Sequence, residues 1–142
     1  MALGSTLNAR IVERFGSRRI SHIALSAFTL IAIGHWLWAM AGQESLISFI
    51  VFQTLTMACM SLSTSNFAAI AMEKVGHVAG TAASLQGVTS MVGGALIGSF
   101  VGQHWTGDVA LLPLGAALCG AVALCLIFRA ENGQLYGRTT VG

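Results

Sequence analysis

The sequence predicts an all-α membrane protein with four transmembrane helices. Hydrophobic residues make up 55% of the 142 residues and charged residues only 8%, whereas a soluble domain carries about 25% charged residues. A helix rises about 1.5 Å per residue, so a run of about 20 apolar residues crosses a bilayer. Four uncharged runs are long enough, at residues 23–41, 46–72, 81–101 and 109–128.

The first run follows a basic segment. Residues 1–8 are mostly apolar but too short to cross a bilayer, and residues 9–22 hold four of the seven basic residues, which predicts a basic loop. The run 23–41 carries Trp36 and Trp38 near its far end, where aromatic side chains lie at a membrane surface. His35 beside them is expected to bond headgroups or water, with a proton-relay role as the alternative.

The second run is expected to present a polar face, after a short turn that contains Glu44. Polar side chains and flexible methionines suit an adaptable, partly wet surface. This face could be the wall of a substrate pathway, or it could hydrogen-bond to neighbouring helices, and both interpretations stay open. Its residues are Gln53, Thr56, Met57, Met60, Thr64 and Phe67.

Small residues form a stripe along the third run, after a charged turn at residues 73–79. They recur every three or four positions, at Gly80, Ser84, Gly87, Gly94, Gly98 and Gly102. In lipid the helical backbone must satisfy its own hydrogen bonds, and missing side chains let another helix approach closely. We expect the rest of the chain to pack on this stripe, so that Gly98→Leu disrupts helix association but leaves insertion intact. Gln86 and Ser90 flank the stripe, and Gln86 is expected to face protein or water.

The basic residues indicate how the helices are oriented. Pro113 is tolerated in the first turns of the fourth run, and a polar tail follows at residues 129–142. In chain order, the five segments outside the runs hold four, zero, one, zero and two basic residues. Because basic residues favour the cytoplasmic side, we expect both termini and the turn at residues 73–79 on that side.

Several kinds of chemistry are not expected. The cysteines Cys59, Cys119 and Cys125 lie in apolar runs without metal-ligand spacing, and we expect them to stay reduced. The sequence contains no nucleophile with a base, paired carboxylates or phosphate-binding loop, so neither an enzyme nor a cofactor is indicated. No basic run with aromatic residues indicates nucleic acid. The runs also lack Asp, Glu, Lys and Arg, whereas proton-coupled transport normally uses an ionisable group inside the membrane.

Two stretches carry recognisable motifs. The residues Glu13, Arg14, Gly16, Arg18 and Arg19 resemble the motif that the major facilitator superfamily has in the cytoplasmic loop between the second and third helices of each six-helix half. Residues 76–87 are similar to the loop and helix near the end of Bcr/CflA-type drug resistance exporters. The resemblance implies that residues 1–8 end an eighth helix, and that the four runs are helices nine to twelve of a twelve-helix fold.

The resemblance also implies a function and a location. Proteins of this type export drug-like small molecules in exchange for protons across the bacterial cytoplasmic membrane. Their tenth helix lines the central cavity, so the candidate substrate contacts are Gln53, Thr56, Met57, Met60 and Thr64, with Gln86 and Ser90 on the next helix. A carrier of this type alternates between two halves. The chain is therefore expected to be a C-terminal fragment that needs the missing N-terminal part and is inactive alone.

Two other functions stay open. A small dimeric multidrug exporter has a similar length and four helices, but it depends on a membrane glutamate that these runs lack. A four-helix scaffold or assembly subunit would instead use the glycine stripe to bind a partner. An in-frame upstream extension encoding eight more helices would favour the carrier fragment.

Overall fold

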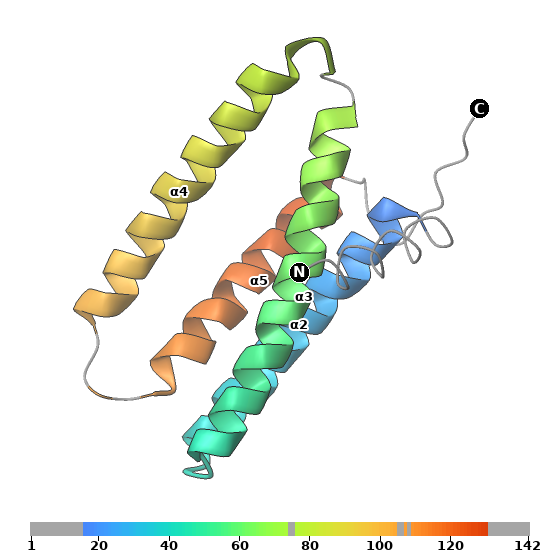
Figure 1. The fold of residues 1–142 in the computed structure, drawn as a ribbon. Coiled ribbons are helices and arrows are strands. Elements are labelled where there is room, and N and C mark those ends of the chain that lie inside the picture. Colours follow the sequence, from blue (N-terminus) through green and yellow to red (C-terminus); the bar gives the residue numbers. More distant parts are fainter. Residues whose placement is uncertain (1–15, 74–75, 105–106, 108, 131–142) are drawn as a thin grey trace.

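Four long helices make up most of the part of the chain that the computed structural model describes, which is residues 16–73, 76–104, 107 and 109–130. They are α2 (Ser17–Met40), α3 (Leu46–Glu73), α4 (Ala79–Gln103) and α5 (Leu111–Ala130), with a 3₁₀ turn, η1 (Gly76–Val78), before α4. All four are long and apolar enough to cross a membrane, and their directions alternate along the chain (Figure 1). The prediction of an all-helical chain with four such helices is confirmed.

Several helix ends differ from the predicted runs. α2 begins at Ser17 rather than at residue 23, α4 extends beyond residues 81–101 at both ends, and α5 is shifted to Leu111–Ala130. The prediction of a loop is therefore wrong for Arg18 and Arg19, which lie in the first turn of α2. An uncharged run marks the length that fits in hydrocarbon, whereas a helix can continue beyond it because long arginine side chains reach back to water. Arg129, predicted in the tail, belongs to α5 for the same reason.

The rest of the predicted basic loop is only partly described. Gly16 directly precedes α2 and has a φ of 80°, a left-handed conformation that glycine adopts without steric cost. Glu13, Arg14 and the expected end of a preceding helix lie outside the described residues, as does the tail from residue 131 onward.

The core is centred on α2, which packs against α3 and against α5. Figure 1 shows α2 running beside both helices, whereas α4 stands apart from them. The buried apolar side chains of α2 are Ile20, Ala24, Leu25, Phe28 and Ala32. In lipid, van der Waals packing on this face, rather than removal of apolar surface from water, holds the three helices together.

One glycine makes the close approach of α5 to α2 possible. A Cβ atom added at Gly120 would clash with Thr29 Oγ1 and would lie 3.1 Å from two ring carbons of Phe28. Gly120 is itself buried. A small residue therefore does bring two helices together, although it lies on α5 rather than on the predicted stripe.

The stripe on α4 is not packed against the described residues. No residue of α4 is buried, and a Cβ atom added at Gly80, Gly87, Gly94, Gly98 or Gly102 would meet nothing within 4 Å. Ser84 is also exposed and donates a hydrogen bond to its own helix, at Gly80 O. The prediction that the rest of the chain packs on this stripe is therefore wrong for the part that the structure describes. Small side chains permit close packing, but they supply no attraction without a complementary surface.

Candidate functional site

All four helices contribute to an apolar groove of about 450 Å³. Its wall includes Leu25 and Phe28 from the core face of α2, and α5 supplies the wall around Gly120. The side chains from α3 and α4 that line it are Met60, Ser63, Thr64, Phe67 and Gln86. A groove of this size, mostly apolar and with a few polar groups, is typical of a site for a small molecule.

Three of the seven predicted substrate contacts meet in this groove. Met60 and Thr64 come from α3 and Gln86 comes from α4, so residues far apart in the sequence line one site. The Thr64 hydroxyl already donates a hydrogen bond to Met60 O at 2.5 Å. Gln86 is half-buried and supplies the single carboxamide among the described lining residues.

The other four predicted contacts do not line the groove. Thr56 is buried at 4% exposure, with its hydroxyl 2.7 Å from Phe52 O. Met57 is half exposed and Gln53 is half-buried, while Ser90 lies on exposed α4. The groove therefore takes only part of the predicted polar face of α3. Thr56 and Asn66 are buried, whereas Met57 and Met60 are about half exposed.

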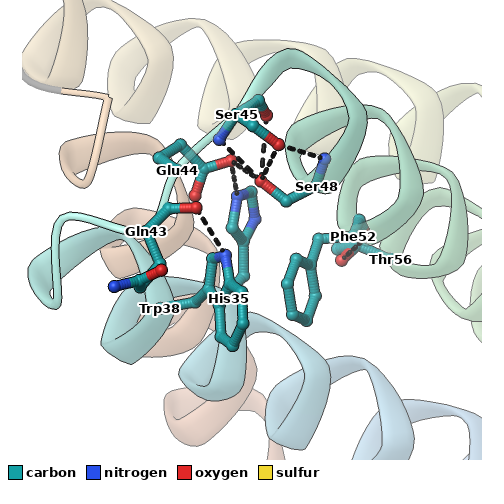
Figure 2. Close-up of polar contacts among 8 residues, drawn as sticks. All are labelled: His35, Trp38, Gln43, Glu44, Ser45, Ser48, Phe52 and Thr56. Carbon is teal, nitrogen blue, oxygen red and sulfur yellow. Dashed lines mark hydrogen bonds and ion pairs between the residues drawn. The ribbon is translucent and has the colours of Figure 1, made fainter.

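A second cluster of side chains, at the α2–α3 turn, was not predicted. His35 is only 2% exposed, and its Nε2 lies 3.4 Å from Glu44 Oε1. The imidazole stacks on Phe52 with the ring centroids 4.8 Å apart and the planes 7° from parallel, and Phe49 meets it edge-on at 5.7 Å. Figure 2 shows His35, Glu44 and Phe52 converging where α2 ends and α3 begins. The prediction that His35 bonds headgroups or water is wrong, because the start of α3 covers the ring.

Local hydrogen bonds fix the turn that carries Glu44. Ser45 and Ser48 form a reciprocal cap at the start of α3: Ser48 N donates to Ser45 Oγ at 3.1 Å, and Ser45 N donates to Ser48 Oγ at 2.8 Å. This arrangement satisfies two backbone donors that the helix leaves free. Trp38 Nε1 donates to Gln43 O at 2.9 Å, which ties the end of α2 to the same turn (Figure 2).

The two sites suit different chemistry. The groove can hold a mainly apolar molecule, while the turn places an imidazole beside a carboxylate. The described residues contain no group of three or more His, Cys, Asp or Glu that could hold a metal ion. The spacing of Ser45 and Ser48 was a sequence signal for the cap, but nothing in the sequence showed that Glu44 would fold back onto His35. Comparison with known protein families, with curated proteins and with solved structures found no match for this chain.

Proposed function

We propose that these four helices form part of a membrane carrier for drug-like, mainly apolar small molecules, related to the Bcr/CflA-type exporters that the sequence resembles. The observation that carries the proposal is the groove itself. Three of the substrate contacts that the resemblance implies, Met60, Thr64 and Gln86, lie on its wall although they come from two helices. Methionine adapts to ligands of different shape, which suits a carrier of several drugs.

The uncovered helix α4 supports the idea that further helices complete the carrier. A helix with no buried residue and a row of glycines leaves room for close contact with another helix. In the proposed carrier, the missing N-terminal part covers this surface, and proton exchange drives export.

The described basic residues support an orientation with both termini on the cytoplasmic side of the bacterial membrane that the resemblance implies. Arg18 and Arg19 lie at the start of α2, and Arg129 lies in the last turn of α5. Because the directions of the helices alternate, these positions lie at the same end of the bundle (Figure 1). This arrangement supports a cytoplasmic location for that end, because basic residues favour the cytoplasmic side.

Two methionines on α3 provide a matched test of the groove. Met60 lines the groove and Met57 does not, although their exposures are 48% and 50%. We expect Met60→Ala to weaken binding of rhodamine 6G by about three- to ten-fold, because apolar contact is lost. Met57→Ala should leave the affinity unchanged. Fluorescence anisotropy of the dye, titrated with the purified chain in detergent, measures both.

Two outcomes would contradict the proposal. Equal effects of the two substitutions would mean that the groove is not where the dye binds. Extrusion of the dye by this chain alone in sealed vesicles would show that it is not part of a larger carrier.

The exposed stripe of α4 favours a second candidate, a membrane scaffold or assembly subunit. In that role Gly98→Leu would prevent association with the partner, while Met60→Ala would change nothing. Measuring the two variants side by side, by energy transfer between labelled chains and by dye binding, separates the scaffold from the carrier.

A further inference from the structure

We propose that Ser63 selects, among the molecules that enter the groove, those that offer an uncharged carbonyl group on a flat, mainly apolar framework. Ser63 is not one of the seven predicted substrate contacts. Its role rests on the proposed function, because the groove is taken as the binding site. The ligand class is therefore aromatic ketones, esters and amides, and the Ser63 hydroxyl donates the hydrogen bond that recognises them.

The Ser63 hydroxyl has an unused capacity to donate. The side chain is buried at 5% exposure and lies on the groove wall. Other hydroxyl side chains of α3 donate a hydrogen bond to the carbonyl four residues earlier, as Thr56, Thr64 and Ser65 do. The Ser63 hydroxyl donates no such bond and has no partner in the part of the chain that the structure describes. Buried hydroxyls are normally paired, and an unpaired one is costly, so a molecule in the groove can supply the missing partner.

The missing partner is an acceptor. Unpaired buried donors are rarer in folded proteins than acceptors with unused lone pairs, so the hydroxyl hydrogen is the atom that most needs a partner. A carbonyl oxygen accepts this hydrogen bond without bringing a donor of its own into an apolar site. The Thr64 hydroxyl does not compete, since its hydrogen bond to Met60 O already uses its donor. Gln86, on the α4 side of the groove, has amide donors for a second acceptor group of the ligand.

The rest of the wall favours an uncharged, flat molecule. None of its described residues is Asp, Glu, Lys, Arg or His. A carboxylate in the groove would lose its hydration without gaining a cationic partner, which leaves ketones, esters and amides as the carbonyl compounds that fit. Phe28 and Phe67 supply aromatic rings to the wall, and aromatic rings pack favourably on one another when offset or edge-on.

Equilibrium dialysis of fluorenone and fluorene tests the role of Ser63. Both are flat tricyclic molecules, and they differ by the carbonyl group. The full chain in detergent is dialysed against the same detergent, so that uptake by micelles is equal on both sides. We expect Ser63→Ala to weaken binding of fluorenone by about three- to ten-fold, because a hydrogen bond is lost. The same substitution should leave the affinity for fluorene unchanged.

Ser65→Ala is the matched control. Ser65 lies close to Ser63 on α3, but it is exposed, does not line the groove and donates to Ser61 O at 2.7 Å. Neither ligand should respond to this substitution, and a loss of fluorenone affinity as large as that of Ser63→Ala would overturn the proposal. Equal effects of Ser63→Ala on the two ligands would also overturn it, since the groove would then select apolar shape alone, as for a lipid chain or another helix.

The carbonyl band in the infrared spectrum supplies a measurement that needs no variant. Fluorenone with an isotopic label at its carbonyl carbon, bound to the native chain, should absorb at a lower frequency than in the detergent alone, because a hydrogen bond weakens the C=O bond. An unshifted band would contradict the proposal even if Ser63→Ala did not fold.

The two methionine variants separate this proposal from the carrier itself. If rhodamine 6G distinguishes Met60→Ala from Met57→Ala but fluorenone does not distinguish Ser63→Ala from the native chain, the groove is still the binding site and only the role of Ser63 is wrong. If neither ligand distinguishes its variants, both proposals fail.

Discussion

Helices α2 and α4 are similar in length and apolar character, but one is packed in the core and the other is exposed. They contain 24 and 25 residues and both are apolar enough to cross a membrane. In the apolar window of α2, 33% of the residues are buried, whereas none are buried in that of α4. α4 has the row of glycines, while α2 has a single glycine, Gly34. The helix best suited to close packing by composition is therefore the one that the described residues leave uncovered.

The buried polar groups of α2 explain part of the difference. Ser21 and Thr29 are almost fully buried, and each donates a hydrogen bond to the carbonyl four residues earlier, at 2.8 and 2.9 Å. Their polar atoms are satisfied within α2, so the same face can pack against another helix without loss of hydrogen bonds. Contact thus depends on complementary shape and satisfied polar groups, and glycine content alone does not produce it.

The largest effect is expected at Gly120, where α5 approaches α2 closely. Gly120→Ala places a Cβ atom against Thr29 Oγ1 and Phe28. Overpacking of this kind costs about 1–3 kcal/mol of the free energy of unfolding. Denaturation by SDS in mixed micelles, followed by circular dichroism, measures the loss.

Gly98→Ala is the control on α4. A Cβ atom there meets nothing within 4 Å, so the substitution should cost no stability and could add up to about 1 kcal/mol through helix propensity.

Thr29→Ala in the Gly120→Ala background should restore part of the loss by making room. Additive losses in that double variant would show that Thr29 is not what Gly120 accommodates.

Two phenylalanine–histidine pairs test the same difference between packed and exposed helices, with a smaller expected change in stability. Phe52 joins α3 to His35 of α2. Phe100 of exposed α4 instead contacts His104, the residue just after the same helix, with ring centroids 4.4 Å apart. Phe52→Leu should lower the free energy of unfolding by about 0.5–1.5 kcal/mol, because a ring contact between helices is lost. Phe100→Leu should have almost no effect in the same denaturation experiment. Equal losses would mean that the contact between α2 and α3 adds nothing beyond a local pair.

The sequence was sufficient to predict the four helices, because an uncharged run of membrane length has few other stable structures. It was less informative about helix ends, since Arg18, Arg19 and Arg129 can remain solvated from helical positions. It also could not assign the partner of each helix. That choice depends on the fit of opposing surfaces, as at Gly120 and Phe28, and not on the composition of either helix alone.

The residues of the candidate sites were also only partly predictable from the sequence. Helical spacing identified Met60 and Thr64, and the cost of an amide in lipid identified Gln86 as facing protein or water. Spacing did not separate Met57 from Met60, because it shows which residues share a helix face and not where along that face a groove opens. The contact of Glu44 with His35 depends on how the turn folds back, which no periodic pattern describes.

The smallest predicted effect concerns how α3 and α4 begin. The N-terminus of α3 is capped by Ser45 and Ser48, whereas the residue before α4, Val78, offers no side-chain cap. Ser45→Ala should lower the free energy of unfolding by about 0.5–1 kcal/mol, because one helix N–H loses its acceptor. Ser84→Ala, which removes an exposed hydroxyl of α4 bonded within its own helix, should be neutral in the same SDS titration. An equal loss of stability in Ser84→Ala would contradict this difference, because the Ser84 hydroxyl would then contribute as much as the Ser45 cap.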